Sequence, residues 1–451
     1  MSTVTNYDGS ITATPQVVVK PKTIGELQDI LKNTAKYPGP VRAMGNFHSL
    51  TPCAASGGTI VEMRGLNKVL KIDRQAMTFT AEAGLQMIEA NEALQKENLQ
   101  LMLNIEIGNM TLGSAACCHS KDSLDGVEFG QVNSYLVGVK WVTPAGELAE
   151  ASAAKNPELL PKIRASYGLA GIVYEVTLRI KPLEIIRFNY HVHQLASLTQ
   201  DDVTQAIATN DSIVCWTIGR TTVIQTRNRA NELEHEWLAE TRRFGWNFLA
   251  AFMGRAIRDH SPGKLVEPLE DLGLDIELGF YRLLDKAGGF TLRDCDKMID
   301  YTKTPQLARY AFTFWAFPRA DFVKNLKDYV DFADGYHRQH GFRCNMPLGS
   351  YFIRQDSHSL LSYSQAGDVI SLDPIHAPGE RDKDAWADFL RAFNEWATRR
   401  GGLPLLNQSP FVKRGHVVAA YGERWKTLCD WLRTVDPQKR MVNPFFEELM
   451  V

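Results

Sequence analysis

Apolar positions in the first fifty residues follow two different periods. The run Val17–Val19 is β-branched throughout, which is typical of a strand. From Thr23 to Lys36 the apolar residues fall three or four positions apart, on one face of a helix. Thr23 and Glu26 have the spacing of a capping box at the start of that helix. Since a short strand at Val41–Met44 follows, residues 16–44 are predicted to form a strand–helix–strand unit.

The same alternation of periods continues to about residue 185. Strands are predicted at 59–62, 77–83 and 135–142, with a helix at 87–97. Residues 168–182 then end in an alternation of apolar and polar side chains that stops at Pro182, which has no backbone N–H to donate to a neighbouring strand. This mixture of strand and helix patterns predicts an α+β fold.

A second domain is expected from about residue 186, where longer helical stretches begin. Residues 231–253 and 321–341 are helical in pattern and rich in aromatic side chains. We expect the aromatic group of the first stretch to pack in a core, with a membrane-resting or partner surface as the alternative. That group comprises Trp237, Phe244, Trp246, Phe248 and Phe252. The predicted division is residues 1–185, residues 186–409, and a C-terminal segment 410–451 that packs back on the first part.

Composition narrows the range of partners. The 451 residues include 50 Lys and Arg against 52 Asp and Glu, a net charge of −2, with no long run of like charges. Nucleic acid and anionic membranes are therefore not indicated as partners. Neither a signal peptide nor an apolar stretch of spanning length is apparent, so we expect a cytoplasmic protein. Seven cysteines without CxxC pairs predict reduced thiols, and no metal site is expected.

The first segment with candidate chemistry is the stretch VRAMGNFHS, residues 41–49. A strand here runs into a tight turn at Gly45, whose backbone amides can face a pyrophosphate without any charged side chain. Neither a GxGxxG nor a GxxxxGK[ST] motif is present, so a Rossmann dinucleotide site and a P-loop are not supported.

This stretch and its neighbours resemble the FAD-binding domain of vanillyl-alcohol-oxidase-type (PCMH-type) flavoproteins, closest to the aldonolactone and alditol oxidase branch. The neighbours are GTIVEMRGLNKVLKID, EAGLQMIEANEALQKENLQL, GNMTLGSAACCH, VGVKWVTPAGEL and GLAGIVYEVTLRIKP, and near the C-terminus VDP and MVNPF. The resemblance covers residues 15–185 and 405–451. It implies a two-domain α+β fold with a separate substrate (cap) domain, and FAD as the cofactor.

In that branch a histidine of the turn is joined to the 8α-methyl of the flavin, and His48 occupies the position. A neutral imidazole is needed for the linkage, and the ordinary pKa of histidine, about 6.5, supplies one near neutral pH. The resemblance implies FAD contacts from Arg42, Ala43, Met44, Gly45, Asn46, Phe47, His48 and Ser49, from Gly108, Thr111, Gly113, Ser114, Cys118 and His119, from Gly171 and Ile172, and from Asn443. Cys118 stands where the family has a small residue that controls oxygen access, and Ser120 replaces a usual glycine.

The substrate side departs from the branch. A Glu and Arg pair that polarises the substrate hydroxyl is replaced by Gly349 and Tyr351. Lys413 lies about where the branch has a lysine beside the substrate, although a surface lysine is an equal alternative. Tyr351, Arg354 and Lys413 are therefore the candidate catalytic residues. Tyr351 as a plain strand aromatic, and Arg354 with Asp356 as a surface ion pair, are the alternatives.

The function expected from these features is FAD-dependent oxidation of a CH–OH group in a small sugar-, alditol- or lactone-like substrate. Hydride passes to flavin N5, and O2 or another acceptor takes the electrons. One alternative is oxidation of a C–N or benzylic C–H bond, in keeping with the missing pair. Another is a flavin-binding electron-transfer subunit without its own substrate, which a well-formed pocket beside the flavin would argue against.

Overall fold

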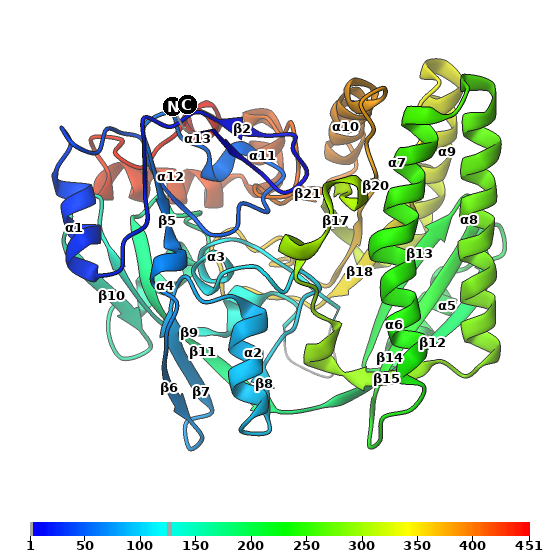
Figure 1. The fold of residues 1–451 in the computed structure, drawn as a ribbon, viewed down its shortest axis with the longest axis horizontal. Coiled ribbons are helices and arrows are strands. Elements are labelled where there is room, and N and C mark those ends of the chain that lie inside the picture. Colours follow the sequence, from blue (N-terminus) through cyan, green and yellow to red (C-terminus); the bar gives the residue numbers. More distant parts are fainter. Residues whose placement is uncertain (1–2, 124–128) are drawn as a thin grey trace.

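The computed structural model describes residues 3–123 and 129–451. Its chain folds into two domains side by side (Figure 1). The first domain holds β1 to β11 and receives the C-terminal helices α11 to α13, whose ribbons lie against the N-terminal part (Figure 1). The second domain holds β12 to β21 and the helices between them. The fold is thus α+β, as the sequence predicts.

Two sheets and a short hairpin build the first domain. Strands β3, β5 and β4 are parallel, and α1 connects β3 to β4. The second sheet is antiparallel in the order β10-β9-β11-β7-β6, and β8 extends along β11. The strands are β1 (Val4–Thr5), β2 (Thr12–Ala13), β3 (Val17–Val19), β4 (Val41–Met44), β5 (Thr59–Glu62), β6 (Val69–Asp73), β7 (Thr78–Glu82), β8 (Leu99–Leu101), β9 (Leu136–Val142), β10 (Leu148–Ser152) and β11 (Ile172–Pro182). The helices are α1 (Ile24–Lys32), α2 (Met87–Gln95), α3 (Leu112–Cys117) and α4 (Leu160–Ile163).

Local sequence signals set these elements. The Thr23 side chain accepts a hydrogen bond from the Glu26 amide, and the Glu26 carboxylate accepts one from the Thr23 amide. This capping box confirms the predicted start of α1. β11 ends at Pro182 as predicted. The chain then enters β12 at Ile185, and the sheet of the second domain begins.

The second domain is an antiparallel sheet covered by helices on both faces. Its strand order is β15-β12-β14-β13-β18-β19-β17-β21. Trp216 and Val214 pack toward α6 and α8, while the alternate residues Ile213 and Cys215 pack toward α5, α9 and α10. The strands are β12 (Ile185–Gln194), β13 (Ser212–Ile218), β14 (Thr221–Ala230), β15 (Phe290–Arg293), β17 (Trp315–Pro318), β18 (Leu348–Ile353), β19 (Val369–Leu372) and β21 (Leu403–Pro404), with β16 (Ala311–Phe312) and β20 (Ile375–His376) as a separate pair. The helices are α5 (Gln200–Thr209), α6 (Glu236–Phe244), α7 (Ala251–His260), α8 (Gly263–Lys286), α9 (Phe322–His340) and α10 (Lys383–Thr398), and one π-helical turn (Gly245–Ala250) joins α6 to α7.

The aromatic stretch around α6 corrects one expectation. The side chains of Trp237 and Phe244 are 65% and 58% exposed, so they do not pack in a core. The reason is that α6 turns Leu238 and Ala239 inward instead. Phe248 and Phe252 are half-buried, and the side chain of Trp246 lies outside the described residues. Among the described residues, no helix has both the length and the apolar character needed to cross a bilayer.

The C-terminal segment returns to the first domain through buried polar contacts. Arg440 donates hydrogen bonds to the carbonyls of Ile30 and Tyr37. Its helices are α11 (Arg414–Tyr421), α12 (Glu423–Val435) and α13 (Pro444–Met450). Both chain ends therefore contribute to the same domain.

Candidate functional site

The two predicted cofactor loops touch each other. A Cβ atom added to Gly45 would lie 2.5 Å from Thr111 Oγ1, so this close approach requires glycine. The next residue, Asn46, donates from its side chain to the Asn109 carbonyl. Phe47 adopts a positive φ of 48°, which turns the chain sharply after β4. The turn after β4 and the loop before α3 therefore form one surface.

Two predicted cofactor residues, Arg42 and Asn443, donate their side-chain hydrogen bonds to backbone carbonyls of the protein itself. Arg42 is buried and donates to the carbonyls of Cys53, Tyr167 and Met441, at 3.0, 2.5 and 3.0 Å. Asn443 caps α13 and donates to the carbonyls of Pro52 and Ala55, both at 2.8 Å. These contacts fix the loop after β4 between the two chain ends.

Glycines in the other predicted loops allow close backbone packing. The Gly108 amide donates to the Ile299 carbonyl at 2.9 Å, and the Gly113 amide donates to the Ala83 carbonyl at 2.7 Å. Gly171 has a φ of 126°, and a Cβ there would lie 2.1 Å from the Val142 carbonyl oxygen. Ile172 begins β11 fully buried beside it. Direct FAD contacts from these residues stay a prediction, as do those from Ala43, Met44, Ser49 and Ser114.

His48 lies where the first loop meets the second domain. Its ring stacks on Tyr7 with centroids 4.2 Å apart and meets the edge of Tyr301 at 5.2 Å. Nε2 is buried and has no hydrogen-bond partner among the described residues. Burial lowers the pKa of His48 to about 4, and the charge of Arg309 acts in the same direction. The imidazole is therefore neutral at neutral pH.

His119 is buried behind the second loop and is fully hydrogen bonded. Nδ1 lies 2.9 Å from the Tyr167 hydroxyl, and Nε2 lies 2.9 Å from Ser359 Oγ. Burial lowers the pKa of His119 to about 3, so the ring is neutral. Cys118 beside it is partly buried, and burial raises the pKa of its thiol well above the ordinary value. The thiol therefore stays protonated.

A cavity opens between the two domains next to His48, because Tyr301 belongs both to its wall and to the packing around the imidazole. Its walls comprise Ile105, Glu106, Ile107, Ser120, Lys121 and Asp122 from the first domain, and Trp216, Tyr301, Tyr310, Phe312, Tyr351, Asp373, Ile375 and Gln408 from the rest of the chain. The walls thus combine five aromatic residues and three isoleucines with six polar or charged residues, a mixture of apolar surface and polar groups that is typical of small-molecule sites.

One buried ion pair stands in this cavity. Lys121 Nζ lies 2.8 Å from Asp373 Oδ2, and the two side chains are 9% and 3% exposed. The ammonium also lies 3.5 Å from the centre of the Tyr351 ring, a cation–π contact. Burial raises the pKa of Asp373 above its ordinary value, although Lys121 opposes the rise. Asp373 Oδ1 is buried with no hydrogen-bond partner among the described residues, so one carboxylate oxygen can still accept a proton.

A second buried charge cluster lies behind Lys121 and joins the domains. Asp122 contacts Arg227 Nη1 at 2.9 Å and Lys297 Nζ at 2.9 Å, and Lys297 also contacts Asp294 at 2.6 Å. Although burial works against ionisation, Arg227 and Lys297 hold the pKa of Asp122 below its ordinary value. Because Asp122 follows Lys121 in the chain, this cluster fixes the position of the Lys121 backbone.

The structure brings Tyr351 to the cavity but not the other two predicted catalytic residues. Lys413 is exposed at the start of α11 and lines a separate surface depression with Phe411 and His416. Arg354 is exposed just beyond the end of β18. Asp356 is buried and bonds to Ser134 and His358, so it is not half of a surface pair with Arg354. Burial raises the pKa of the Tyr351 phenol well above its ordinary value, which keeps it protonated.

Sequence reasoning missed Lys121 and Asp373. Lys121 follows His119 by two residues, so an extension of the second predicted loop would have included it. Asp373 has no such signal, because it reaches Lys121 across 252 positions of the chain.

The residues present fit a bound polar cofactor and substrate. Some buried side-chain atoms in these loops and in the cavity have no hydrogen-bond partner among the described residues; they include His48 Nε2, Asn109 Oδ1, Ser120 Oγ, Asp373 Oδ1 and Gln408 Oε1. Unsatisfied buried polar groups are costly in a protein interior. A polar ligand that forms hydrogen bonds with these atoms would remove that cost.

Comparison with known proteins supports the presence of an FAD-binding domain. A family model described as FAD binding domain matches residues 15–152. The L-gulono-1,4-lactone dehydrogenase of Mycobacterium tuberculosis (strain CDC 1551 / Oshkosh) is 30% identical over 198 residues, which cover 43% of this chain and 44% of that protein. The L-gulonolactone oxidase of Scyliorhinus torazame is 26% identical over 189 residues, 42% of each chain. The match thus spans less than half the length of these relatives.

Similarity of fold extends over the whole chain. The crystal structure of cholesterol oxidase from B. sterolicum superposes with a TM-score of 0.75 at 15% identity, covering 100% of this chain and 96% of that one. At this identity the likeness shows a shared two-domain architecture.

Proposed function

Because residues 15–152 form an FAD binding domain whose relatives include aldonolactone dehydrogenases and oxidases, we propose that this chain is an FAD-dependent oxidoreductase. It oxidises a CH–OH group of a small sugar-, alditol- or lactone-like substrate. The observation that carries the proposal is the cavity between the domains. It holds the Lys121–Asp373 ion pair, and its wall residue Tyr301 also packs against the His48 ring. An electron-transfer subunit without a substrate would not need such a cavity.

Oxidation of a CH–OH group removes a hydride from carbon and a proton from oxygen. Bound FAD supplies the two-electron acceptor for the hydride. The protein must accept the proton, and Asp373 lines the cavity with one carboxylate oxygen that has no hydrogen-bond partner among the described residues. Its raised pKa brings it closer to the working pH, which suits a general base.

Lys121 positions and balances this base. Its ammonium donates to Asp373 Oδ2, which leaves Oδ1 without a hydrogen-bond partner among the described residues. The positive charge also favours the alkoxide character that develops as the proton leaves. The face of the Tyr351 ring stabilises the ammonium through the cation–π contact. In this proposal Tyr351 stays in the active site, and Lys121 and Asp373 take the place of Lys413 and Arg354 as catalytic candidates.

His48 is the proposed attachment point of the flavin. An imidazole nitrogen would lose its proton and bond to the 8α carbon, which would lose one hydrogen, and the two electrons released would pass to the flavin and then to O2 or another acceptor. A pKa of about 4 leaves the ring neutral and nucleophilic at neutral pH. If the linkage forms, denatured protein stays yellow, and the tryptic peptide from Ala43 to Arg64 gains the mass of one FAD. His48→Ala would then release its flavin on denaturation. A colourless wild-type pellet would overturn the linkage while leaving FAD binding intact.

A second candidate is oxidation of an aromatic alcohol or benzylic C–H bond. The specific observation in its favour is the aromatic wall of the cavity, formed by Trp216, Tyr301, Tyr310, Phe312 and Tyr351. Planar aromatic substrates pack against such walls through offset or edge contacts. Sugars offer fewer apolar faces but more hydroxyls for Ser120 and Gln408.

Anaerobic bleaching of the flavin distinguishes these candidates. The holoenzyme is mixed with aldonolactones, alditols, benzylic alcohols and amines, and the loss of flavin absorbance is followed. We expect rapid bleaching by members of the lactone or alditol group. Bleaching by benzylic compounds alone would select the second candidate, and no bleaching by any class would overturn an oxidoreductase acting in this cavity.

A further inference from the structure

Helix α8 exposes a continuous apolar stripe along its length. Leu265, Leu269, Leu272, Ile276 and Leu283 follow one another at spacings of four, three, four and seven residues, and their exposed fractions are 44%, 37%, 55%, 65% and 55%. The opposite side of α8 is buried against the domain through Leu278, Tyr281 and Leu284. The helix therefore has a second apolar side that its own domain does not cover.

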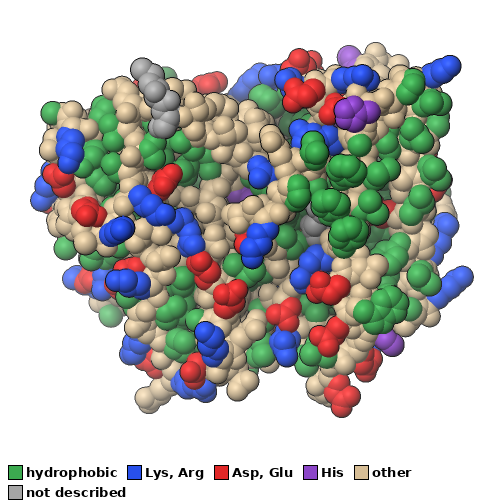
Figure 2. Space-filling model, in the orientation of Figure 1, with side chains coloured by type: hydrophobic (Ala, Val, Ile, Leu, Met, Phe, Trp, Pro, Cys, Tyr) green, Lys and Arg blue, Asp and Glu red, His purple; other side chains and the backbone are tan. Residues whose placement is uncertain are grey.

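Neighbouring elements extend this surface. Trp237, Phe244, Leu249 and Met253, from α6 to α7, are exposed by 65%, 58%, 46% and 45%. Figure 2 shows hydrophobic side chains gathered over α7 and α8. We call these nine side chains the α6–α8 apolar face. A 24-residue helix is about 36 Å long and two packed helices are about 20 Å wide, which gives roughly 700 Å², close to one side of a standard protein interface.

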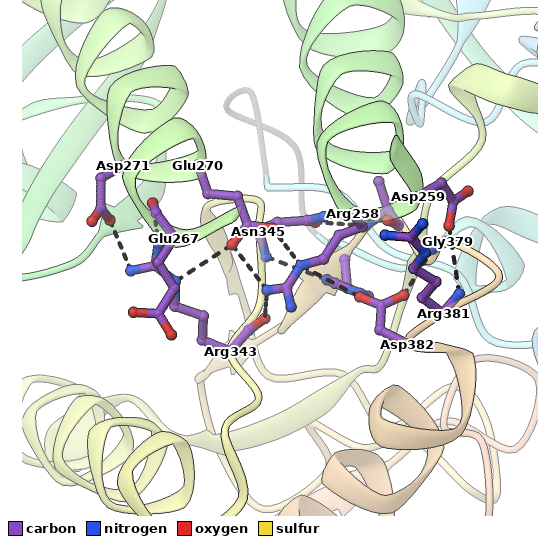
Figure 3. A network of polar contacts seen from close by, with 12 residues as sticks. Arg258, Asp259, Glu267, Glu270, Asp271, Arg343, Asn345, Gly379, Arg381 and Asp382 are labelled. Atoms are coloured by element: carbon purple, nitrogen blue, oxygen red, sulfur yellow. Dashed lines mark hydrogen bonds and ion pairs between the residues drawn. The ribbon is translucent and has the colours of Figure 1, made fainter. Parts of the chain in front are cut away.

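A polar network holds the α7–α8 pair in place (Figure 3). Arg258 of α7 bonds to Glu270 of α8 and lies 3.5 Å from Asp382. Arg343 joins the same network through Asp271 at 2.7 Å and Glu270 at 3.5 Å. Glu270 is buried, so the connection is shielded from solvent. The exposed face is therefore presented on a fixed support.

We propose that the α6–α8 apolar face binds a second copy of this chain, with α8 packed antiparallel to α8 of that copy about a two-fold axis. A repeat of apolar residues at alternating spacings of four and three is the seam by which two helices pack. Gly279 falls in this seam, and no atom lies within 4 Å of a Cβ added there, so the partner helix can approach closely.

Charge on the flank of the seam fits this arrangement. Asp275 and Arg282 are both exposed on the same side of the stripe, and neither pairs with another described residue. In an antiparallel pair centred at the level of Leu278, Asp275 lies beside Arg282 of the second copy, and the reverse contact forms by symmetry. Opposite charges thus meet twice across one interface.

A lipid surface fits the same face less well. Helix α8 carries six acidic side chains against three basic ones. Helices that lie on anionic membranes are rich in Lys and Arg on their polar side. The net negative charge of α8 therefore favours a protein partner.

Sedimentation velocity of the flavin-loaded protein over a range of concentrations tests the proposal. The wild type is expected to sediment as a dimer. Ile276→Lys should weaken dimerisation at least about a hundredfold, because each substitution acts twice across a two-fold interface. Leu148→Lys changes a side chain of β10 in the first domain that is 56% exposed, against 65% for Ile276, and should leave the dimer intact.

Charge reversal tests the register. Asp275→Arg and Arg282→Asp should each weaken the dimer, and the double variant should restore it, with flavin content unchanged throughout. A wild type that stays monomeric, or a dimer unaffected by Ile276→Lys, would overturn the proposal. So would a monomer that co-sediments with phosphatidylcholine–phosphatidylglycerol vesicles through this face, since the occupant would then be lipid.

Discussion

Two lysines in two loops show how differently this protein uses the same side chain. Lys121 follows the second cofactor loop and is buried against Asp373 and the Tyr351 ring. Lys413 precedes α11 and is exposed to solvent. A desolvated ion pair interacts strongly with whatever enters the cavity, whereas a solvated ammonium is screened by water. Sequence position suggested Lys413, but burial and a charged partner favour Lys121.

The largest effect expected from this difference is that of Asp373→Asn. Removing the proton acceptor should slow anaerobic flavin reduction about a thousandfold while FAD content stays normal. Stopped-flow absorbance with the best substrate measures it. Asp368→Asn, a partly exposed carboxylate paired with Arg319, is the matched control. A loss below tenfold in Asp373→Asn would show that another group accepts the proton.

Lys121→Met should slow flavin reduction about a hundredfold, since the base keeps its oxygen but loses its orienting cation. The pKa of Asp373 should also rise further, because Lys121 now lowers it. A pH series of reduction rates records both changes. Slower reduction without any shift of the pH profile would mean that Lys121 acts on the fold rather than on Asp373.

The rate of flavin reduction in the wild type should also depend on pH through the ionisation of Asp373. Asp373 works as a base when it is ionised, so the reduction rate should rise with pH through its pKa and level off above it. Burial raises that pKa, so the rising limb should lie above the usual range of an aspartate, with about a tenfold change per pH unit on its acid side. A profile that is flat from the ordinary aspartate range upward would exclude Asp373.

Oxygen access adds a modest effect near the same loop. Cys118 is partly buried at the end of α3, and burial keeps its thiol protonated. We expect this thiol to narrow the route of O2 to a bound flavin. Cys118→Gly should speed reoxidation of the reduced flavin by O2 several-fold, measured by mixing with aerated buffer. Cys118→Ser, which keeps the size, is the control. Equal rates in all three proteins would remove Cys118 from oxygen control.

Lys413→Met should leave flavin reduction within about twofold of the wild type, because exposed surface substitutions usually change free energies by less than about 0.5 kcal/mol. It is the matched control for Lys121→Met, with the same chemical change at a solvated site. A hundredfold loss here would reverse the comparison and return the catalytic role to the C-terminal loop.

The predicted elements of the first domain depend on signals a few residues apart, which explains their success. The capping box of α1, the strand β4 and the end of β11 at Pro182 all appear where the sequence places them. The need for glycine at position 45 was also visible, although its cause, contact with Thr111, was not.

The sequence by itself determined the α+β character, the turn at His48 and the loop before α3, because each is encoded in a continuous segment. Tertiary structure alone decided the cavity. Lys121 and Asp373 lie far apart in the chain, and neither has a burial pattern that reveals the other. It also decided that Trp237 and Phe244 face outward, since an aromatic helix shows which residues are apolar but not how many of its sides the fold will cover. Desolvation and pairing arise when distant segments pack, so the chemistry of the site belongs to the folded chain.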